Sequence, residues 1–131
     1  MEKPNRDRFV SIVDDDPGIC LALKALMRSA GLAAEAFPSA EEFLESGRVD
    51  QTACLVLDMQ LPRMSGLELQ RHLAATGARV PIVFITAHDQ DEARAAALQS
   101  GAAAFLSKPL SRGVLLACVL GIVNLPYLGG K

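Results

Sequence analysis

The stretch CLVLDMQLPRMSG, residues 54–66, combines the strongest strand signal in the chain with a single acidic residue. Its apolar run at residues 55–57 predicts a buried strand, and Asp58 follows that run directly. Pro62 and Gly66 then favour a turn. A carboxylate beside a buried strand is costly to desolvate unless another group compensates it. The rest of the chain must therefore supply the compensating groups.

Four further segments have the composition of short strands, and each is followed by a segment with helical periodicity. The expected strands are residues 9–13, 32–37, 53–59, 80–87 and 102–109. The expected helical segments are residues 19–31, 38–47, 65–77, 89–101 and 111–125. Strands and helices that alternate in this way indicate an α/β fold, a doubly wound five-stranded parallel sheet with five helices, of the flavodoxin-like kind.

Length and composition predict one domain that needs neither disulfides nor a structural metal. The chain has 131 residues, of which 50% are hydrophobic, enough for a sizeable core. We expect the domain to span residues 9–125, after an N-terminal extension at residues 1–8 and before a tail or linker at residues 126–131. The formal net charge of −2 does not favour binding to nucleic acid or anionic lipid.

No segment has the pattern of an export signal or a membrane span. The charged N-terminus lacks the apolar core of a signal peptide. The longest apolar run begins at Gly113, and we expect its helix to end before Pro126, too short to cross a bilayer. A cytoplasmic location is the expectation.

Polar residues stand where the expected strands end. In a parallel sheet the carboxyl ends of the strands meet at one edge, where such folds bind ligands. The residues at these ends are Asp14, Asp15 and Asp16 after the first strand, Asp58 after the third, Thr86 in the fourth, and Ser107 and Lys108 after the fifth. We therefore expect carboxylates, a hydroxyl and an ammonium group to converge on one spot.

Such a cluster is suited to a hard divalent cation and to phosphoryl chemistry. Mg²⁺ prefers oxygen ligands, and crowded carboxylates would repel one another without a cation. An aspartate can accept a phosphoryl group, with a cation, Lys108 and Thr86 balancing and orienting the charge. Taken singly, the residues have simpler explanations: the acids at 14–16 as helix caps, Thr86 as a strand residue, and Asp58 as the start of a turn.

The motifs that carry these residues resemble the receiver domain of two-component response regulators. They are VDDD at 13–16, LVLDMQLPRMSG at 55–66, ITA at 85–87 and KP at 108–109. The resemblance extends from about residue 9 to about residue 125. PSAEEFL, GLELQRHLAATG and VPIVFITAHDQ are most similar to receivers of the nitrogen-fixation regulator type, which commonly carry a C-terminal helix-turn-helix domain.

The resemblance implies a phosphoacceptor and a metal site rather than an enzyme. Asp58 would accept a phosphoryl group from a sensor histidine kinase or a phosphotransfer protein. Mg²⁺, or Mn²⁺, would be bound by the side chains of Asp15 and Asp58, by the backbone carbonyl of Gln60, and by Asp14 through a water molecule. Asp16 is given no ligand role.

The resemblance also implies a switch. Lys108 would pair with the phosphoryl group and precede a cis bond to Pro109, while Thr86 would bind a phosphoryl oxygen and draw its loop inward. Phe105 would then turn inward, without the hydroxyl of the tyrosine found in many relatives. Two positions beside the path of an attacking water, Gln60 and His88, would tune the lifetime of the phosphorylated state.

The last predicted helix has no charged residue between positions 113 and 125. An exposed apolar stripe usually marks a partner surface. The resemblance implies that this surface, formed by the fourth helix, fifth strand and fifth helix, would make a homodimer or an output contact. No basic helix pair follows Pro126, so no nucleic-acid contact is expected from this segment. The chain is a stand-alone receiver or part of a longer transcriptional regulator.

Two other classes of protein share parts of this pattern. A haloacid-dehalogenase-type phosphatase also uses an aspartyl nucleophile, but it places DxDxT near the first strand, whereas Gln60 stands two residues after Asp58 here. A flavodoxin-like flavin binder has a phosphate loop after the first strand, where this chain has three acids that would repel a phosphate. Both alternatives fit less well than a receiver.

Overall fold

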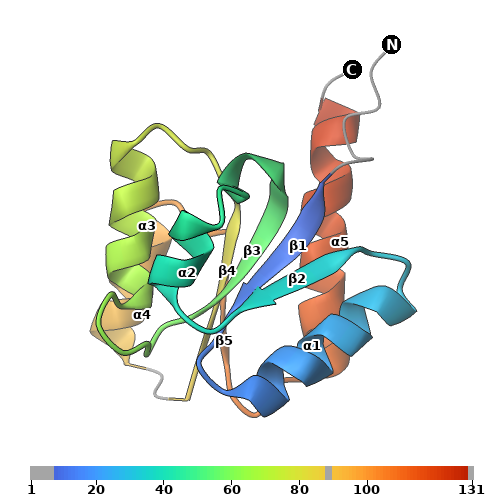
Figure 1. Ribbon diagram of the computed structural model, residues 1–131, viewed down its shortest axis with the longest axis horizontal. Helices are drawn as coiled ribbons and strands as arrows, with labels where there is room; N and C mark the ends of the chain where they lie inside the picture. The colour runs from blue at the N-terminus through green and yellow to red at the C-terminus, as the bar shows by residue number, and fades with distance from the viewer. Residues whose placement is uncertain (1–7, 88–89, 130–131) are drawn as a thin grey trace.

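The five expected strands form one parallel sheet. The computed structural model of the protein describes residues 8–87 and 90–129. Its sheet has the strand order β2-β1-β3-β4-β5, with every neighbouring pair parallel (Figure 1). The strands are β1 (Phe9–Val13), β2 (Ala34–Phe37), β3 (Thr52–Asp58), β4 (Ile82–Thr86) and β5 (Ala104–Ser107). The order reverses direction beside β1, so the crevice of this fold lies at the ends of β1 and β3.

Helices cover both faces of the sheet. They are α1 (Pro17–Ser29), α2 (Ala40–Glu45), α3 (Gly66–Ala75), α4 (Asp91–Gln99) and α5 (Arg112–Gly129), with a short 3-10 turn at Val49–Gln51. Helices α1 and α5 lie on one face, and α2, α3 and α4 lie on the other (Figure 1). The prediction of a doubly wound five-stranded parallel sheet with five α-helices is confirmed for the described part of the chain.

Strand β3 contributes to the apolar core on both faces of the sheet. Leu55 and Leu57 pack with residues of α2, α3 and α4, whereas Cys54 and Val56 pack with residues of α1 and α5. All four side chains are 0% exposed. This two-sided burial explains why the strand is a continuous apolar run rather than an alternating one.

Helices α1, α2 and α3 all begin with side-chain caps, and Ser39 caps α2 by accepting a hydrogen bond from the backbone N–H of Glu42 at 3.1 Å. Asp16 caps α1, accepting a hydrogen bond from the backbone N–H of Gly18 at 2.8 Å. Ser65 and Glu68 form a complete capping box at the start of α3. These caps fix where each helix leaves the sheet edge, and so they define the loops that hold the polar residues at the strand ends.

The prediction that the last helix ends before Pro126 was wrong. Helix α5 continues past Pro126 to Gly129, so the tail expected at residues 126–131 begins inside it. The fixed φ of proline is close to the helical value, so the chain can continue as a helix, at the cost of one backbone hydrogen bond and of crowding against the carbonyl four residues before. Over the described residues, no helix is both long enough and apolar enough to cross a membrane.

Candidate functional site

Three carboxylates meet at the carboxyl end of the sheet. Asp14 follows β1 and Asp58 ends β3, and the parallel register that pairs Val13 with Leu57 brings them side by side. Asp14 is 1% exposed and Asp58 is 4% exposed, while Asp15 is exposed to solvent. Ligand oxygens of all three acids lie within 4.8 Å of one another. The predicted convergence of these acids is therefore observed.

Lys108 is the cation that faces this cluster. Its Nζ lies 3.3 Å from Oδ2 of Asp14 and 3.7 Å from Oδ2 of Asp58. Its backbone N–H donates a hydrogen bond to the carbonyl of Thr86 at 2.7 Å, which ties the start of the β5–α5 connection to the end of β4. The bond from Lys108 to Pro109 is cis. One ammonium group facing three carboxylates leaves the site with an excess of negative charge.

Burial and the neighbouring acids both act on the ionisation of Asp58. Burial, with Asp14 as the next cause, raises the pKa of Asp58 from its ordinary value of 3.8 to about 6. The hydrogen bond that the Gln60 backbone N–H donates to Asp58 Oδ1, at 3.1 Å, and the charge of Lys108 act in the opposite direction. These two effects lower the pKa by less than burial and the neighbouring acids raise it. An added divalent cation would favour the charged form, and a donor set made only of oxygens suits Mg²⁺.

Thr86 and Gln60 are joined across the site. Thr86 ends β4, is 0% exposed, and donates a hydrogen bond from Oγ1 to Oε1 of Gln60 at 3.0 Å. The backbone N–H of the same glutamine contacts Asp58. Gln60 therefore contacts both the carboxylate and the hydroxyl, a link between β3 and β4 that the sequence alone did not reveal.

Phe105, on β5, lies in the same core cluster as Phe84. It is 6% exposed, and its ring centroid is 6.1 Å from that of Phe84 on β4. The guanidinium of Arg94, on α4, lies 4.8 Å from the Phe105 centroid. Phe105, the residue predicted to take part in a switch, is thus buried in this structure and covered by a cation from the neighbouring helix.

Two predicted candidates remain, Asp16 and His88, and two residues that were not predicted make contacts near the site. Asp16 caps α1 and does not belong to the carboxylate cluster. His88 lies outside the described residues. Sequence reasoning did not identify Glu41 and Arg94, which contact the loop after Asp58 and the ring of Phe105 respectively. No spacing or motif in the sequence links either residue to its contact.

Comparisons with known proteins agree with this geometry. Residues 10–120 match the family model described as "Response regulator receiver domain". The chain is 44% identical over 112 residues to Nodulation protein W of Bradyrhizobium diazoefficiens, covering 86% of this chain and 49% of that protein. It is 36% identical over 110 residues to the transcriptional regulatory protein FixJ of Azorhizobium caulinodans, covering 84% of this chain and 52% of that protein.

A solved structure of the response regulator StyR matches with a TM-score of 0.83 and 43% identity, covering 92% of this chain and 61% of that one. The chain spans about half the length of the two curated relatives. The resemblance to receivers of two-component regulators, with FixJ among the relatives, is confirmed, and neither the phosphatase nor the flavin-binding alternative is favoured. The chain belongs to the response regulator receiver domain family, a family of signalling proteins.

Proposed function

We propose that Asp58 accepts a phosphoryl group from the phosphohistidine of a sensor kinase or phosphotransfer protein, and that this controls a transcriptional regulator. The observation that carries the proposal is the buried carboxylate of Asp58, which has ligand oxygens of Asp14 and Asp15 within 4.8 Å and the ammonium of Lys108 at 3.7 Å. A carboxylate oxygen attacks phosphorus, the N–P bond of the donor breaks, and the imidazole leaves with the electron pair. The domain acts as the acceptor in this transfer and is not an enzyme.

The divalent cation site is proposed at the same cluster. Asp15 and Asp58 would bind Mg²⁺ or Mn²⁺ through their side chains, Gln60 through its backbone carbonyl, and Asp14 through a water molecule. When bound, the cation supplies positive charge to the oxygens of the transferring phosphoryl group. Lys108 would supply further positive charge to the phosphoryl group, because its ammonium already contacts Asp14 and Asp58. The raised pKa of Asp58 supports a need for this added charge.

The output is proposed to pass through Thr86 to the face formed by α4, β5 and α5. The Thr86 hydroxyl would leave Gln60 and bind a phosphoryl oxygen, and the packing of Phe105 beneath Arg94 would carry the change to α4. Leu98 on α4 is 43% exposed and Val114 on α5 is 50% exposed, which favours a homodimer or an output contact on this face.

We also propose the bounds of the receiver domain, its cellular location and its place in a longer regulator. Residues 9–125 would form the receiver, with no direct nucleic-acid contact, and a cytoplasmic regulator would carry its DNA-binding part elsewhere. FixJ is a transcriptional regulatory protein of which this chain covers 52%. Gln60 and His88 would set the lifetime of the phosphorylated state.

A small phosphodonor tests the proposed chemistry. The protein is incubated with acetyl phosphate and MgCl₂, or with EDTA in place of the metal, and acyl phosphate is measured by its lability to hydroxylamine. We expect one hydroxylamine-labile phosphoryl group per chain with Mg²⁺ and almost none with EDTA. Equal incorporation in EDTA, or a hydroxylamine-stable product, would contradict the proposal.

Light scattering after size exclusion tests the output face. We expect the phosphoryl mimic beryllofluoride to increase the molar mass toward that of a dimer. A monomer both with and without beryllofluoride would contradict the proposed homodimer.

A further inference from the structure

The loop between β3 and α3, residues 59–65, is fixed in the structure at both of its ends. The backbone N–H of Met59 donates to the carbonyl of Ile85 at 2.9 Å, and the N–H of Gly66 donates back to the carbonyl of Met59 at 3.1 Å. Met59 and Leu61 are 6% and 8% exposed, so their side chains hold the first half of the loop in the core. Gln60, whose carbonyl is the proposed metal ligand, lies in that half.

The second half of the loop contains an unfavourable backbone conformation. Arg63 has φ of +64°, in the left-handed region that residues with a side chain seldom adopt. Such a conformation costs about 1 kcal/mol or more and persists only when surrounding contacts enforce it. The loop therefore needs support from outside itself.

Glu41 of α2 provides that support. Its Oε2 accepts a hydrogen bond from the backbone N–H of Met64 at 3.0 Å, and its Oε1 lies 3.7 Å from the guanidinium of Arg63. Oε1 is buried and has no hydrogen-bond partner within the part of the chain that the structure describes, so the Arg63 charge compensates it. Backbone hydrogen bonds, including the one from Met64, lower the pKa of Glu41.

We propose that Glu41 is a positioning residue for the divalent cation, acting through the β3–α3 loop. By holding Arg63 and Met64 in place, it fixes the path of the chain on which the Gln60 carbonyl is presented beside Asp58. The inference rests on the proposed metal site. Outer contacts that orient metal ligands commonly change metal affinity by tenfold or more when they are removed.

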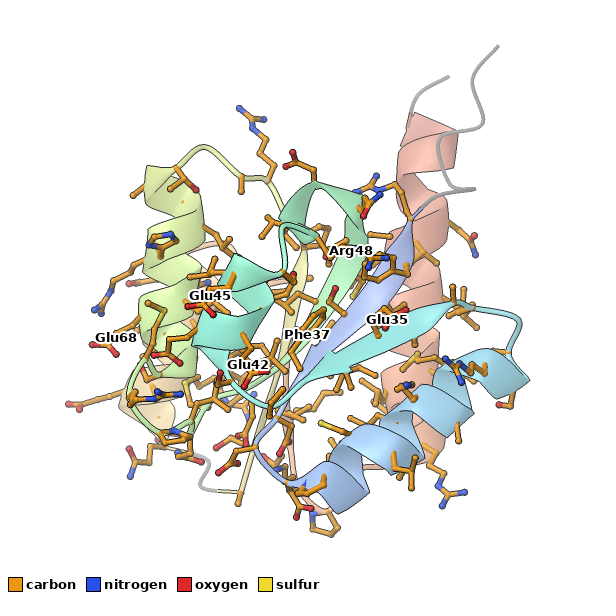
Figure 2. The ribbon with its side chains drawn as sticks, in the orientation of Figure 1. Glu35, Phe37, Glu42, Glu45, Arg48 and Glu68 are labelled. Carbon is orange, nitrogen blue, oxygen red and sulfur yellow. The ribbon has the colours of Figure 1, made fainter. Side chains whose placement is uncertain are left out.

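The test compares Glu41 with its neighbour Glu42. Glu42 lies on the same helix, is exposed, and carries the same charge (Figure 2). Mg²⁺ binding is measured by isothermal titration calorimetry for wild type, Glu41→Ala, Glu41→Gln and Glu42→Ala, and the amides of Gln60 and Met64 are followed by NMR. Urea titration establishes that each variant is folded.

We expect Glu41→Ala to weaken Mg²⁺ binding about tenfold and to shift both amides, because the loop loses its external support. Glu41→Gln keeps an acceptor for the Met64 N–H and should recover a large part of the affinity, and Glu42→Ala should stay within about twofold of wild type. If Glu41→Ala does not fold, the comparison of Glu41→Gln with Glu42→Ala decides: Glu41→Gln should bind more weakly, since it has lost the ion pair with Arg63.

Equal affinity in wild type and Glu41→Ala would overturn the inference and leave the proposed function intact. Equal weakening in the Glu41 and Glu42 variants would also overturn it, because the effect would then be one of overall charge. An absence of Mg²⁺ binding in the wild type would instead refute the proposed metal site. The two failures are therefore distinguishable.

Discussion

The hydroxyl of Thr86 donates a hydrogen bond to Oε1 of Gln60 at 3.0 Å, across the carboxyl ends of β3 and β4. The same hydroxyl is proposed to bind a phosphoryl oxygen on Asp58. The two interactions would compete for one hydroxyl proton, so in the proposed switch the glutamine side chain would favour the resting arrangement. A hydrogen bond of this kind contributes about 1 kcal/mol.

Replacing Gln60 with methionine should release this restraint while leaving the backbone carbonyl in place. We expect the Gln60→Met variant to bind beryllofluoride about fivefold more tightly, which corresponds to about 1 kcal/mol. Calorimetric titration in excess Mg²⁺ measures the affinity. Gln99→Met, at an exposed position of α4, is the matched control and should behave as wild type. Equal affinities for all three proteins would show that the Gln60 side chain does not restrain Thr86.

The raised pKa of Asp58 predicts a pH-dependent stability for the metal-free protein. The folded-state pKa of about 6 lies above the ordinary value of 3.8, so the folded state holds this proton more tightly than the unfolded state does. The resulting stabilisation is fully present below pH 4 and is lost as the pH rises through 6. Asp58→Asn carries no such charge, so in EDTA at pH 8 its free energy of unfolding should exceed that of wild type by at most about 3 kcal/mol.

Urea titrations at pH 4.5 and pH 8 in EDTA measure this difference between the two proteins. We expect it to widen between the two pH values and to shrink when Mg²⁺ is added at pH 8. A difference that is independent of pH would mean that the charge on Asp58 is not destabilising in the folded state.

Phe105 should contribute strongly to stability because its ring is buried between Phe84 and Arg94. Truncation to alanine should lower the free energy of unfolding by about 3 kcal/mol, since a cavity forms and the cation loses its aromatic partner. Leu98→Ala, at a side chain that is 43% exposed on α4, should cost less than about 1 kcal/mol. Similar losses for the two variants, measured by urea unfolding, would contradict the packing described for Phe105.

Gly66 is required by the close approach of α3 to the end of β3. A Cβ at this position would lie 2.7 Å from the carbonyl oxygen of Asp58 and 3.1 Å from the ring of Phe84. Gly66→Ala should therefore destabilise the fold by about 1–3 kcal/mol and disturb the phosphoacceptor. Gly121→Ala is the control: apart from its chain neighbours and the nearby backbone of its own helix, no heavy atom of the described structure lies within 4 Å of the added Cβ, and the helix should gain about 0.5–1 kcal/mol. Thermal unfolding of the pair should show shifts of opposite sign.

The sequence was sufficient to predict the fold and the convergence of the acids. Continuous apolar runs such as residues 55–57 are typical of strands covered on both faces, and parallel strands bring their carboxyl ends to one edge. That rule alone places Asp14, Asp58 and Lys108 together. The end of α5 was mispredicted because Pro126 was treated as a stop, although the φ of proline is compatible with a helix and α5 continues to Gly129.

The contacts that hold the site in place could not be predicted in this way. Glu41 reaches Met64 over 23 positions in the chain, and Arg94 covers Phe105 from a helix whose pattern gives no sign of it. Such contacts depend on the rotamers of long side chains and on the path of an irregular loop. Neither has a periodic signal, so they become visible only once the fold has been built.

The identity of the phosphoacceptor is tested most directly by intact mass after incubation with acetyl phosphate and Mg²⁺. Asp16→Asn is the matched control, because asparagine caps a helix as well as aspartate does and Asp16 lies outside the carboxylate cluster. Wild type and Asp16→Asn should each gain the mass of one phosphoryl group, and Asp58→Asn should gain none. A phosphoryl group gained by Asp58→Asn at the wild-type rate would contradict the account.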